Sequence, residues 1–136
     1  MVDKSQPVLI VDDSRTMCAV ISKIVNQIGF KDVDAVYTGL DALAQLRKRT
    51  YGLIIADWEM SPMSGPDLIM KIRGDKTLPT AAIVLTTANH QWVADMLKSQ
   101  TTSGADIHIL KPFTAEALAK KLADKFPETE TEIVLV

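Results

Sequence analysis

The stretch VLIVDD, Val8–Asp13, consists of four apolar residues followed by two carboxylates. Two later stretches have a similar form: LIIAD at Leu53–Asp57, and HILKPF at His108–Phe113, where the apolar run stops at Lys111. Short apolar runs between loop signals are typical of buried parallel strands. Because the carboxyl ends of parallel strands share one edge of a sheet, where ligands bind, the acids and the lysine are predicted to meet at that edge.

Strand and helix patterns alternate along the rest of the chain. After the first strand, apolar residues at helical spacing predict a helix that Ser14 caps and Gly29 ends. The other expected helices are Gly39–Lys48, Pro66–Ile72, Gln91–Lys98 and Ala115–Lys125. The expected strands are Val8–Val11, Val33–Tyr37, Leu53–Ala56, Ile83–Thr86 and Ile107–Leu110. Helix-length connections imply right-handed crossovers, so we predict a doubly wound α/β domain with a five-stranded parallel sheet.

Length and composition indicate one globular domain. The chain has 136 residues, of which 47% are hydrophobic and 24% charged, and a net charge of −2. We expect the domain to cover residues 1–126 and residues 127–136 to form a tail. The apolar end of this tail, IVLV, is expected to dock on a sheet edge or on a second molecule.

The same features argue against several classes of protein. The slightly acidic balance argues against a nucleic-acid-binding surface. The sequence contains neither a membrane span nor a signal peptide, and Cys18 has no second cysteine with which to pair. We therefore expect a cytoplasmic protein that is not inserted in a membrane, with Cys18 as a plain core thiol.

The acids at the strand ends predict a cation site. Asp12, Asp13 and Asp57 would repel one another, by about 4 kcal/mol for two carboxylates 4 Å apart at an effective dielectric near 20, and a cation relieves this. Carboxylates suit Mg²⁺, and no histidine–cysteine cluster favours zinc. Lys111 and Thr87 add a positive charge and a hydroxyl for a phosphoryl group. Taken singly, each of these residues also fits an ordinary surface or strand position.

Read together, the positions on successive strands form one motif: Asp12-Asp13, Asp57, Thr87-Ala88 and Lys111-Pro112-Phe113. This motif resembles the signature of response-regulator receiver domains, the chemotaxis-type fold, and the resemblance runs from about Pro7 to Phe126. It implies a flavodoxin-like (βα)5 fold with strand order 2-1-3-4-5. It also implies a signalling protein of a two-component system, acting in chemotaxis or in a phosphorelay, rather than a metabolic enzyme.

The resemblance also implies roles for the site residues. Asp57 would accept a phosphoryl group from a sensor histidine kinase or a histidine phosphotransfer protein, and the domain would catalyse only this step and its own dephosphorylation. The expected Mg²⁺ ligands are the side chains of Asp13 and Asp57 and the backbone carbonyl of Glu59, with Asp12 acting partly through water. The expected phosphoryl-binding groups are Thr87, Ala88 and Lys111.

The expected output is a change at a protein-binding face. Thr87 would move toward the phosphoryl group, coupled to the residue three positions before Lys111. That position is usually Tyr or Phe in the family, but here it is His108, so the usual coupling is in doubt, and His108 also fits an outward strand residue. The expected face for a downstream protein comprises Trp92, His108, Pro112 and Phe113, although Trp92 also fits a core position.

Three other functions fit the pattern less well. A phosphorylation-independent receiver usually lacks one of the acids or the lysine, and all are present here. A phosphatase of the haloacid-dehalogenase kind carries Asp-x-Asp after its first strand, where this chain has Asp12-Asp13. A flavodoxin would need a phosphate-binding loop at that point, and the two acids would repel the phosphate. Glu59, two residues after Asp57, fits two roles in the receiver reading: it obstructs the water that attacks the phosphoryl group, or it pairs with Lys111.

Overall fold

Five parallel strands form one sheet in the order β2-β1-β3-β4-β5, which confirms the predicted fold class. The described residues of this computed structural model are 2–89, 91, 94 and 104–127. The strands are β1 (Val8–Val11), β2 (Val33–Val36), β3 (Leu53–Asp57), β4 (Ala82–Thr87) and β5 (Ile107–Leu110). All five strands therefore lie where the alternating pattern predicted them, with boundaries that differ by at most one residue.

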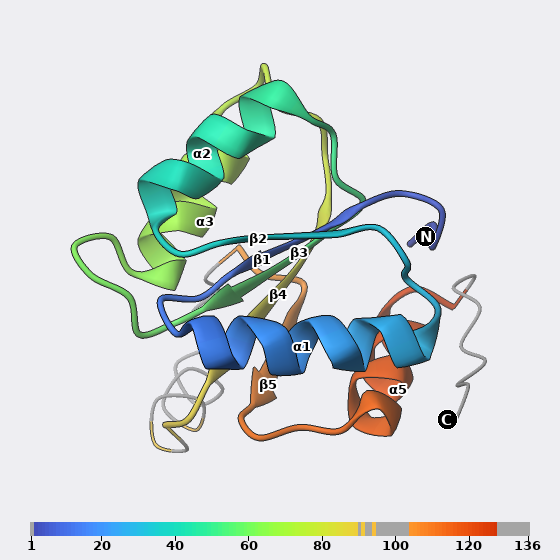
Figure 1. Cartoon of the computed structure of the whole chain (residues 1–136). Coiled ribbons are helices and arrows are strands. Elements are labelled where there is room, and N and C mark those ends of the chain that lie inside the picture. Colours follow the sequence, from blue (N-terminus) through green and yellow to red (C-terminus); the bar gives the residue numbers. More distant parts are fainter. Residues whose placement is uncertain (1, 90, 92–93, 95–103, 128–136) are drawn as a thin grey trace.

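Helices cover both faces of the sheet. They are α1 (Arg15–Ile28), α2 (Gly39–Lys48), α3 (Gly65–Gly74) and α5 (Ala115–Lys125). Figure 1 shows α1 and α5 on one face and α2 and α3 on the other. The helix expected at Gln91–Lys98 falls on residues that the structure does not describe, apart from Gln91 and Ala94. Trp92 and the IVLV tail lie outside the described residues as well.

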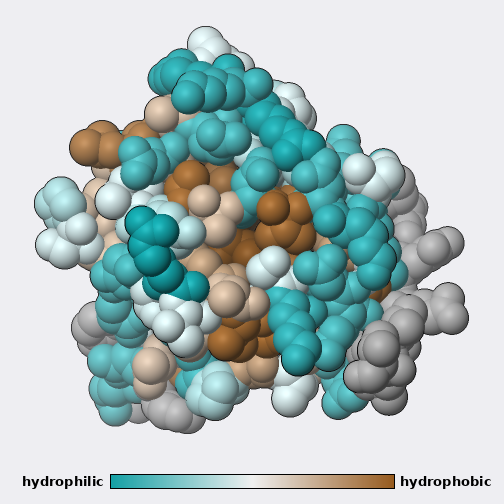
Figure 2. All heavy atoms as spheres, in the orientation of Figure 1, coloured by the Kyte–Doolittle hydropathy of each residue, from teal (hydrophilic) through white to brown (hydrophobic). Residues whose placement is uncertain are grey.

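Alternation along the strands divides the core into two layers. Val8 and Ile10 of β1 belong to the apolar cluster beneath α1 and α5, whereas Leu9 and Val11 belong to the cluster beneath α2 and α3. All four side chains are fully buried. Figure 2 shows that hydrophilic residues cover most of the outer surface on the side in view. No helix among the described residues has both the length and the apolar character that a bilayer crossing needs.

The helix ends follow from local side-chain chemistry. The Ser14 side chain accepts a hydrogen bond from the Met17 N–H, which confirms the predicted cap of α1. Gly29 ends this helix with φ 126°, a backbone conformation that favours glycine. The structure starts α3 one residue earlier than predicted, because Ser64 caps it through the Asp67 N–H, and ends it two residues later, at Gly74.

The register of the sheet places the strand ends at one edge. Val11 of β1 pairs with Ala56 of β3, so the residues that follow them, Asp12 and Asp57, are neighbours. Asp57 in turn pairs with Thr86 of β4. The acids that follow β1, the last residue of β3 and the end of β4 therefore lie in this order along one edge of the sheet, as the parallel topology requires.

Candidate functional site

Three carboxylates meet at the carboxyl edge of the sheet. Asp12, Asp13 and Asp57 each contribute an oxygen to a group whose members all lie within 4.8 Å of one another. Asp12 and Asp57 are buried, with 1% and 4% exposure, whereas Asp13 is exposed. The Asp12 carboxylate also accepts a hydrogen bond of 2.9 Å from the Ser14 N–H, which ties it to the start of α1. Oxygen donors in this arrangement suit a hard divalent cation.

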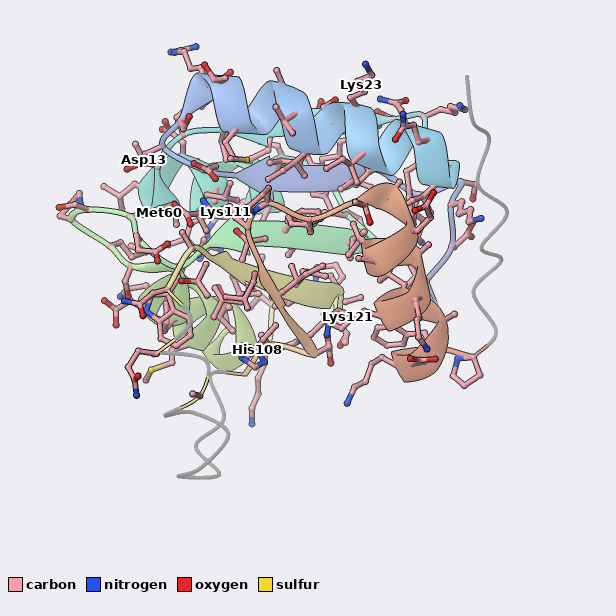
Figure 3. All side chains as sticks on the ribbon, turned by 90° about the horizontal axis from the view of Figure 1, so that it is seen from below. Asp13, Lys23, Met60, His108, Lys111 and Lys121 are labelled. Atoms are coloured by element: carbon pink, nitrogen blue, oxygen red, sulfur yellow. The ribbon has the colours of Figure 1, made fainter. Side chains whose placement is uncertain are left out.

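Lys111 reaches this cluster from the loop between β5 and α5. Its Nζ lies 2.9 Å from Asp57 Oδ1 and 3.4 Å from Asp12 Oδ2, and its side chain is 13% exposed. The backbone N–H of Lys111 donates to the Thr87 carbonyl at 2.8 Å, and a cis peptide bond joins Lys111 to Pro112. Figure 3 shows Asp13, Met60 and Lys111 at the same edge of the sheet. The lysine thus points inward, toward the acids.

The buried charges alter one another's protonation. Burial is the largest influence on Asp57 and raises the pKa of this carboxyl well above its ordinary value; Lys111 opposes the shift, and Glu59 and Asp12 add to it. Burial pushes the pKa of Lys111 downward, but the neighbouring Asp57 and Asp12 outweigh it and raise the pKa overall. Asp57 is therefore a carboxyl whose charge depends on the cations around it.

Asp57 Oδ1 has a further property that bears on a bound cation. Among the described residues it is a buried side-chain oxygen without a hydrogen bond of normal geometry, although Lys111 Nζ lies 2.9 Å away. The Lys111 ammonium contacts one side of this oxygen, and a carboxylate oxygen has further acceptor capacity for a second cation. The donor set and this oxygen both fit a divalent cation at the edge.

Thr87 and Glu59 meet at the same place. The Thr87 hydroxyl, 1% exposed, donates a hydrogen bond of 2.5 Å to Glu59 Oε1 and accepts one of 3.0 Å from the Asn89 N–H. Burial, the largest influence, pushes the pKa of Glu59 upward, but hydrogen bonds with Thr87 and Asp57 outweigh it and lower the pKa overall. Ala88 directly follows β4 and is exposed, whereas Thr87 at the end of the strand is buried.

Sequence reasoning missed the position of the Glu59 side chain. The structure directs the carboxylate to Thr87, and the expectation that Glu59 obstructs the attacking water stays a prediction. The position of Glu59 two residues after Asp57 was the only available signal.

Gly65 also has a role that the sequence did not reveal. A Cβ at Gly65 would lie 2.3 Å from the Asp57 backbone oxygen, and the Gly65 N–H donates to the Trp58 carbonyl at 3.0 Å. The loop that carries Glu59 therefore returns directly against the end of β3. The sequence analysis predicted only that a helix begins here, at Pro66.

His108 lies apart from the acids, on β5. It lines a pocket of about 380 Å³ with Pro112, Phe113 and Lys121, and Figure 3 shows it well away from Lys111. Burial and then the nearby charge of Lys121 lower the pKa of His108. Phe113 is partly buried against the core beneath α1 and α5, and Pro112 is exposed. Of the expected partner face, the structure thus brings three residues together, and Trp92 is outside the described residues.

A second pocket had no signal in the sequence. Leu40, Pro62, Met63 and Met70 contribute to a pocket of about 620 Å³ beside α2 and α3. Leu40, in the first turn of α2, is 66% exposed. Met70 is 69% exposed on α3.

Comparison with known proteins identifies the class to which this fold and site belong. The family model for the response regulator receiver domain matches residues 8–123. The chain therefore belongs to the response regulator receiver family, whose chemotaxis-type members are signalling proteins of two-component systems rather than classical enzymes.

Individual relatives agree with this assignment. The chain is 32% identical over 122 residues to the chemotaxis protein CheY-3 of Vibrio cholerae serotype O1, covering 90% of this chain and 92% of that protein. It is 30% identical over 119 residues to the chemotaxis protein CheY of Pseudomonas aeruginosa, covering 88% of this chain and 94% of that protein. The solved structure of the chemotaxis response regulator CheY4 of Vibrio cholerae is similar, with a TM-score of 0.75, 26% identity and coverage of 90% and 99%.

Proposed function

We propose that this chain accepts a phosphoryl group on Asp57 from a phosphohistidine of a sensor histidine kinase or a phosphotransfer protein. The observation that carries the proposal is the environment of Asp57: a buried carboxyl at the sheet edge, 2.9 Å from the Lys111 ammonium and beside two further acids. A carboxylate nucleophile, an internal cation and a cation-binding donor set are the parts that phosphoryl transfer to an acid requires.

In the proposed reaction an Asp57 oxygen attacks phosphorus in line with the phosphohistidine nitrogen. The O–P bond forms as the N–P bond breaks, and the imidazole leaves with the electron pair and takes up a proton. Lys111 then faces a phosphoryl oxygen, and the Thr87 hydroxyl and the Ala88 N–H donate to the others. In the hydrolysis step, a water oxygen attacks phosphorus as the bond to the Asp57 oxygen breaks. Inorganic phosphate leaves with the water oxygen, the water gives up a proton, and the Asp57 carboxylate is regenerated. Both steps depend on positioning and charge neutralisation.

We also propose that the site holds Mg²⁺. The ligands would be the carboxylates of Asp12, Asp13 and Asp57 and the backbone carbonyl of Glu59. The support is the group of three carboxylates, whose oxygens all lie within 4.8 Å of one another, and the burial of Asp12 and Asp57. When bound, Mg²⁺ would neutralise charge on the acids and on the phosphoryl oxygens.

The proposed output is a protein contact. Thr87 and His108 would transmit the phosphorylation state to a face that includes Pro112 and Phe113, and a downstream protein would bind there. We assign these functions to residues 1–126, with 127–136 as a tail. The proposed place of action is the cytoplasm, with which the lone buried thiol of Cys18 is compatible.

A second candidate function rests on one observation. The Thr87 hydroxyl already has a charged acceptor in Glu59, so a receiver that switches without phosphorylation is the alternative. Such a protein would bind its partner equally well with and without a phosphoryl donor.

The first experiment measures intact mass after incubation with acetyl phosphate and Mg²⁺. We expect a single phosphoryl adduct on the wild type and none on Asp57→Asn, which keeps the size of the side chain but is a poor nucleophile. The absence of an adduct on the wild type, with a phosphohistidine donor failing as well, would reject phosphorylation and favour the alternative.

Cation binding has its own test. We expect Asp13→Asn to weaken Mg²⁺ binding by about tenfold or more, since it removes one of few charged ligands. Fluorescence of Trp58, which follows Asp57 directly, provides the titration signal. Asp124→Asn is the matched control, because Asp124 is exposed and pairs with Lys120 on α5. Equal Mg²⁺ affinity in Asp13→Asn and wild type would contradict the assigned ligand set.

A further inference from the structure

Glu59 lies among the groups that the proposed reaction assigns to the phosphoryl group. Its carboxylate accepts a hydrogen bond from the Thr87 hydroxyl, with 2.5 Å between the two oxygens, and it lies close enough to Asp57 to raise the pKa of that carboxyl. The charge of Lys111 acts on it as well. One carboxylate therefore contacts or faces the nucleophile, the hydroxyl and the cation of the site, which are the three side chains expected around a transferred phosphoryl group.

The hydrogen bonds of Thr87 show what Glu59 does to the switch hydroxyl. The Asn89 N–H donates to Thr87 Oγ1 at 3.0 Å, and the Thr87 proton is directed at Glu59 Oε1. Both the acceptor and the donor capacity of this buried hydroxyl are thus engaged before any phosphoryl group arrives. A hydrogen bond to a charged acceptor is stronger than one between neutral groups, so Thr87 is held firmly in this position.

We propose that the Glu59 carboxylate is an internal substitute for the phosphoryl group. In the unphosphorylated chain it holds Thr87 at the sheet edge in the position that a phosphoryl oxygen would otherwise stabilise. A phosphoryl group entering on Asp57 has to displace this carboxylate, because two anions do not share one set of donors. This inference rests on the proposed phosphorylation of Asp57. It adds that Glu59 fixes the position of Thr87 in the unphosphorylated protein and opposes the phosphorylation of Asp57.

Two possible effects of Glu59 lead to different results in the free protein: repulsion of an incoming anion, and a hydrogen bond that holds Thr87. If Glu59 only repelled an incoming anion, its removal would favour phosphorylation and leave Thr87 unchanged in the free protein. If Glu59 also holds Thr87, its removal changes the free protein as well. The state of Thr87 without any ligand is therefore the decisive quantity.

The test uses beryllofluoride with Mg²⁺ as the probe, since it adds to a carboxylate as a tetrahedral mimic of a phosphoryl group. NMR of the ¹³C-labelled threonine methyl groups reports on Thr87, assigned with Thr87→Val. We compare the full-length wild type with Glu59→Ala, which removes the carboxylate, and with Glu59→Gln, which keeps a neutral acceptor of the same size.

We expect the Thr87 methyl signal of the free protein to shift in Glu59→Ala and to shift less in Glu59→Gln. We expect both variants to bind beryllofluoride at least about tenfold more tightly than the wild type, because a charged hydrogen bond and a like-charge contact no longer compete. Addition of beryllofluoride should move the Thr87 signal further in Glu59→Ala than in the wild type, where one anionic acceptor replaces another.

Two results would overturn the inference. Tighter beryllofluoride binding with an unchanged Thr87 signal in the free variants would reduce Glu59 to a source of repulsion. Unchanged beryllofluoride affinity in both variants would show that Glu59 does not compete with a phosphoryl group at Asp57. Failure of the proposed function is recognised separately, as the absence of any adduct on wild type and variants alike, and the Thr87 comparison in the free proteins still decides whether Glu59 holds the hydroxyl.

Discussion

His108 is the residue at which this chain departs from the pattern of its family, and its surroundings have a measurable consequence. It is half-buried on β5, and burial together with Lys121 on α5 lowers the pKa below the ordinary value of 6.5. The folded protein therefore prefers the neutral imidazole. A titratable group at this position distinguishes the proposed output face from one built on an aromatic residue.

The sign of the resulting pH dependence follows from linkage. Because the unfolded chain binds a proton more readily than the folded chain, this contribution to the free energy of unfolding is fully present above pH 6.5 and is lost as the pH falls below it. We expect urea denaturation to show the wild type losing stability between pH 7.5 and about pH 5 more steeply than His108→Phe. Lys121→Gln should flatten the dependence, and equal slopes in all three proteins would contradict it.

At the scale of elements, the contact between β3 and α3 sets the geometry of the acceptor. Gly65 opens α3 against the backbone of Asp57, and a Cβ there would also lie 2.7 Å from Leu85 Cδ1 of β4. The helix start, the end of β3 and the loop with Glu59 are thus packed as one unit. No other residue fits this contact without moving one of the two elements.

We expect Gly65→Ala to lower the free energy of unfolding by about 1–3 kcal/mol, the usual cost of overpacking. The variant should also slow phosphorylation of Asp57, because the backbone of the acceptor has to shift. Gly74→Ala at the other end of α3 is the matched control, since nothing lies within 4 Å of its Cβ position. This control should be neutral or slightly stabilising. Equal midpoints for both variants in urea would show that the contact is not tight.

At the scale of the whole molecule, one arginine links elements that are far apart in sequence. Arg73 at the end of α3 donates to the Ala81 carbonyl before β4, at 3.0 Å, and to the Gly104 carbonyl, at 3.1 Å. It also pairs with Asp106 at 2.9 Å, whose carboxylate accepts the Ile83 N–H at 2.8 Å. These contacts link the segment that precedes β5 to α3 and β4.

We expect Arg73→Met to lower the free energy of unfolding by about 1–3 kcal/mol, because it removes a donor from two backbone carbonyls and the ion-pair partner of Asp106. Arg47→Met is the matched control: Arg47 pairs with Asp75 on the surface, where its side chain is 63% exposed, and the change should be within about 0.5 kcal/mol. Urea denaturation of the two variants decides the matter. Similar losses in both would show that the links made by Arg73 contribute no more than a surface pair.

The fold was largely accessible from local patterns. The apolar runs that end at Asp12 and Asp57 predicted the strands, and the helical spacing up to Gly29 predicted α1, because strand and helix periods and helix caps are properties of neighbouring residues. The crossover rule then made the sheet parallel and brought the strand ends to one edge. The membership of Asp12, Asp13, Asp57, Thr87 and Lys111 in one edge group follows from that topology alone.

What only the tertiary structure decided are the contacts within that edge. Glu59 and Thr87 are 28 positions apart, and their 2.5 Å hydrogen bond depends on how the loop after β3 returns against α3. The close approach of Gly65 to Asp57, the exposure of Leu40 and the three partners of Arg73 are likewise set by packing between elements. Periodicity records which face a residue occupies, but not which distant side chain it meets there. For that physical reason the sequence by itself determined the sheet and the edge where the acids gather. The tertiary structure decided which groups at that edge contact one another.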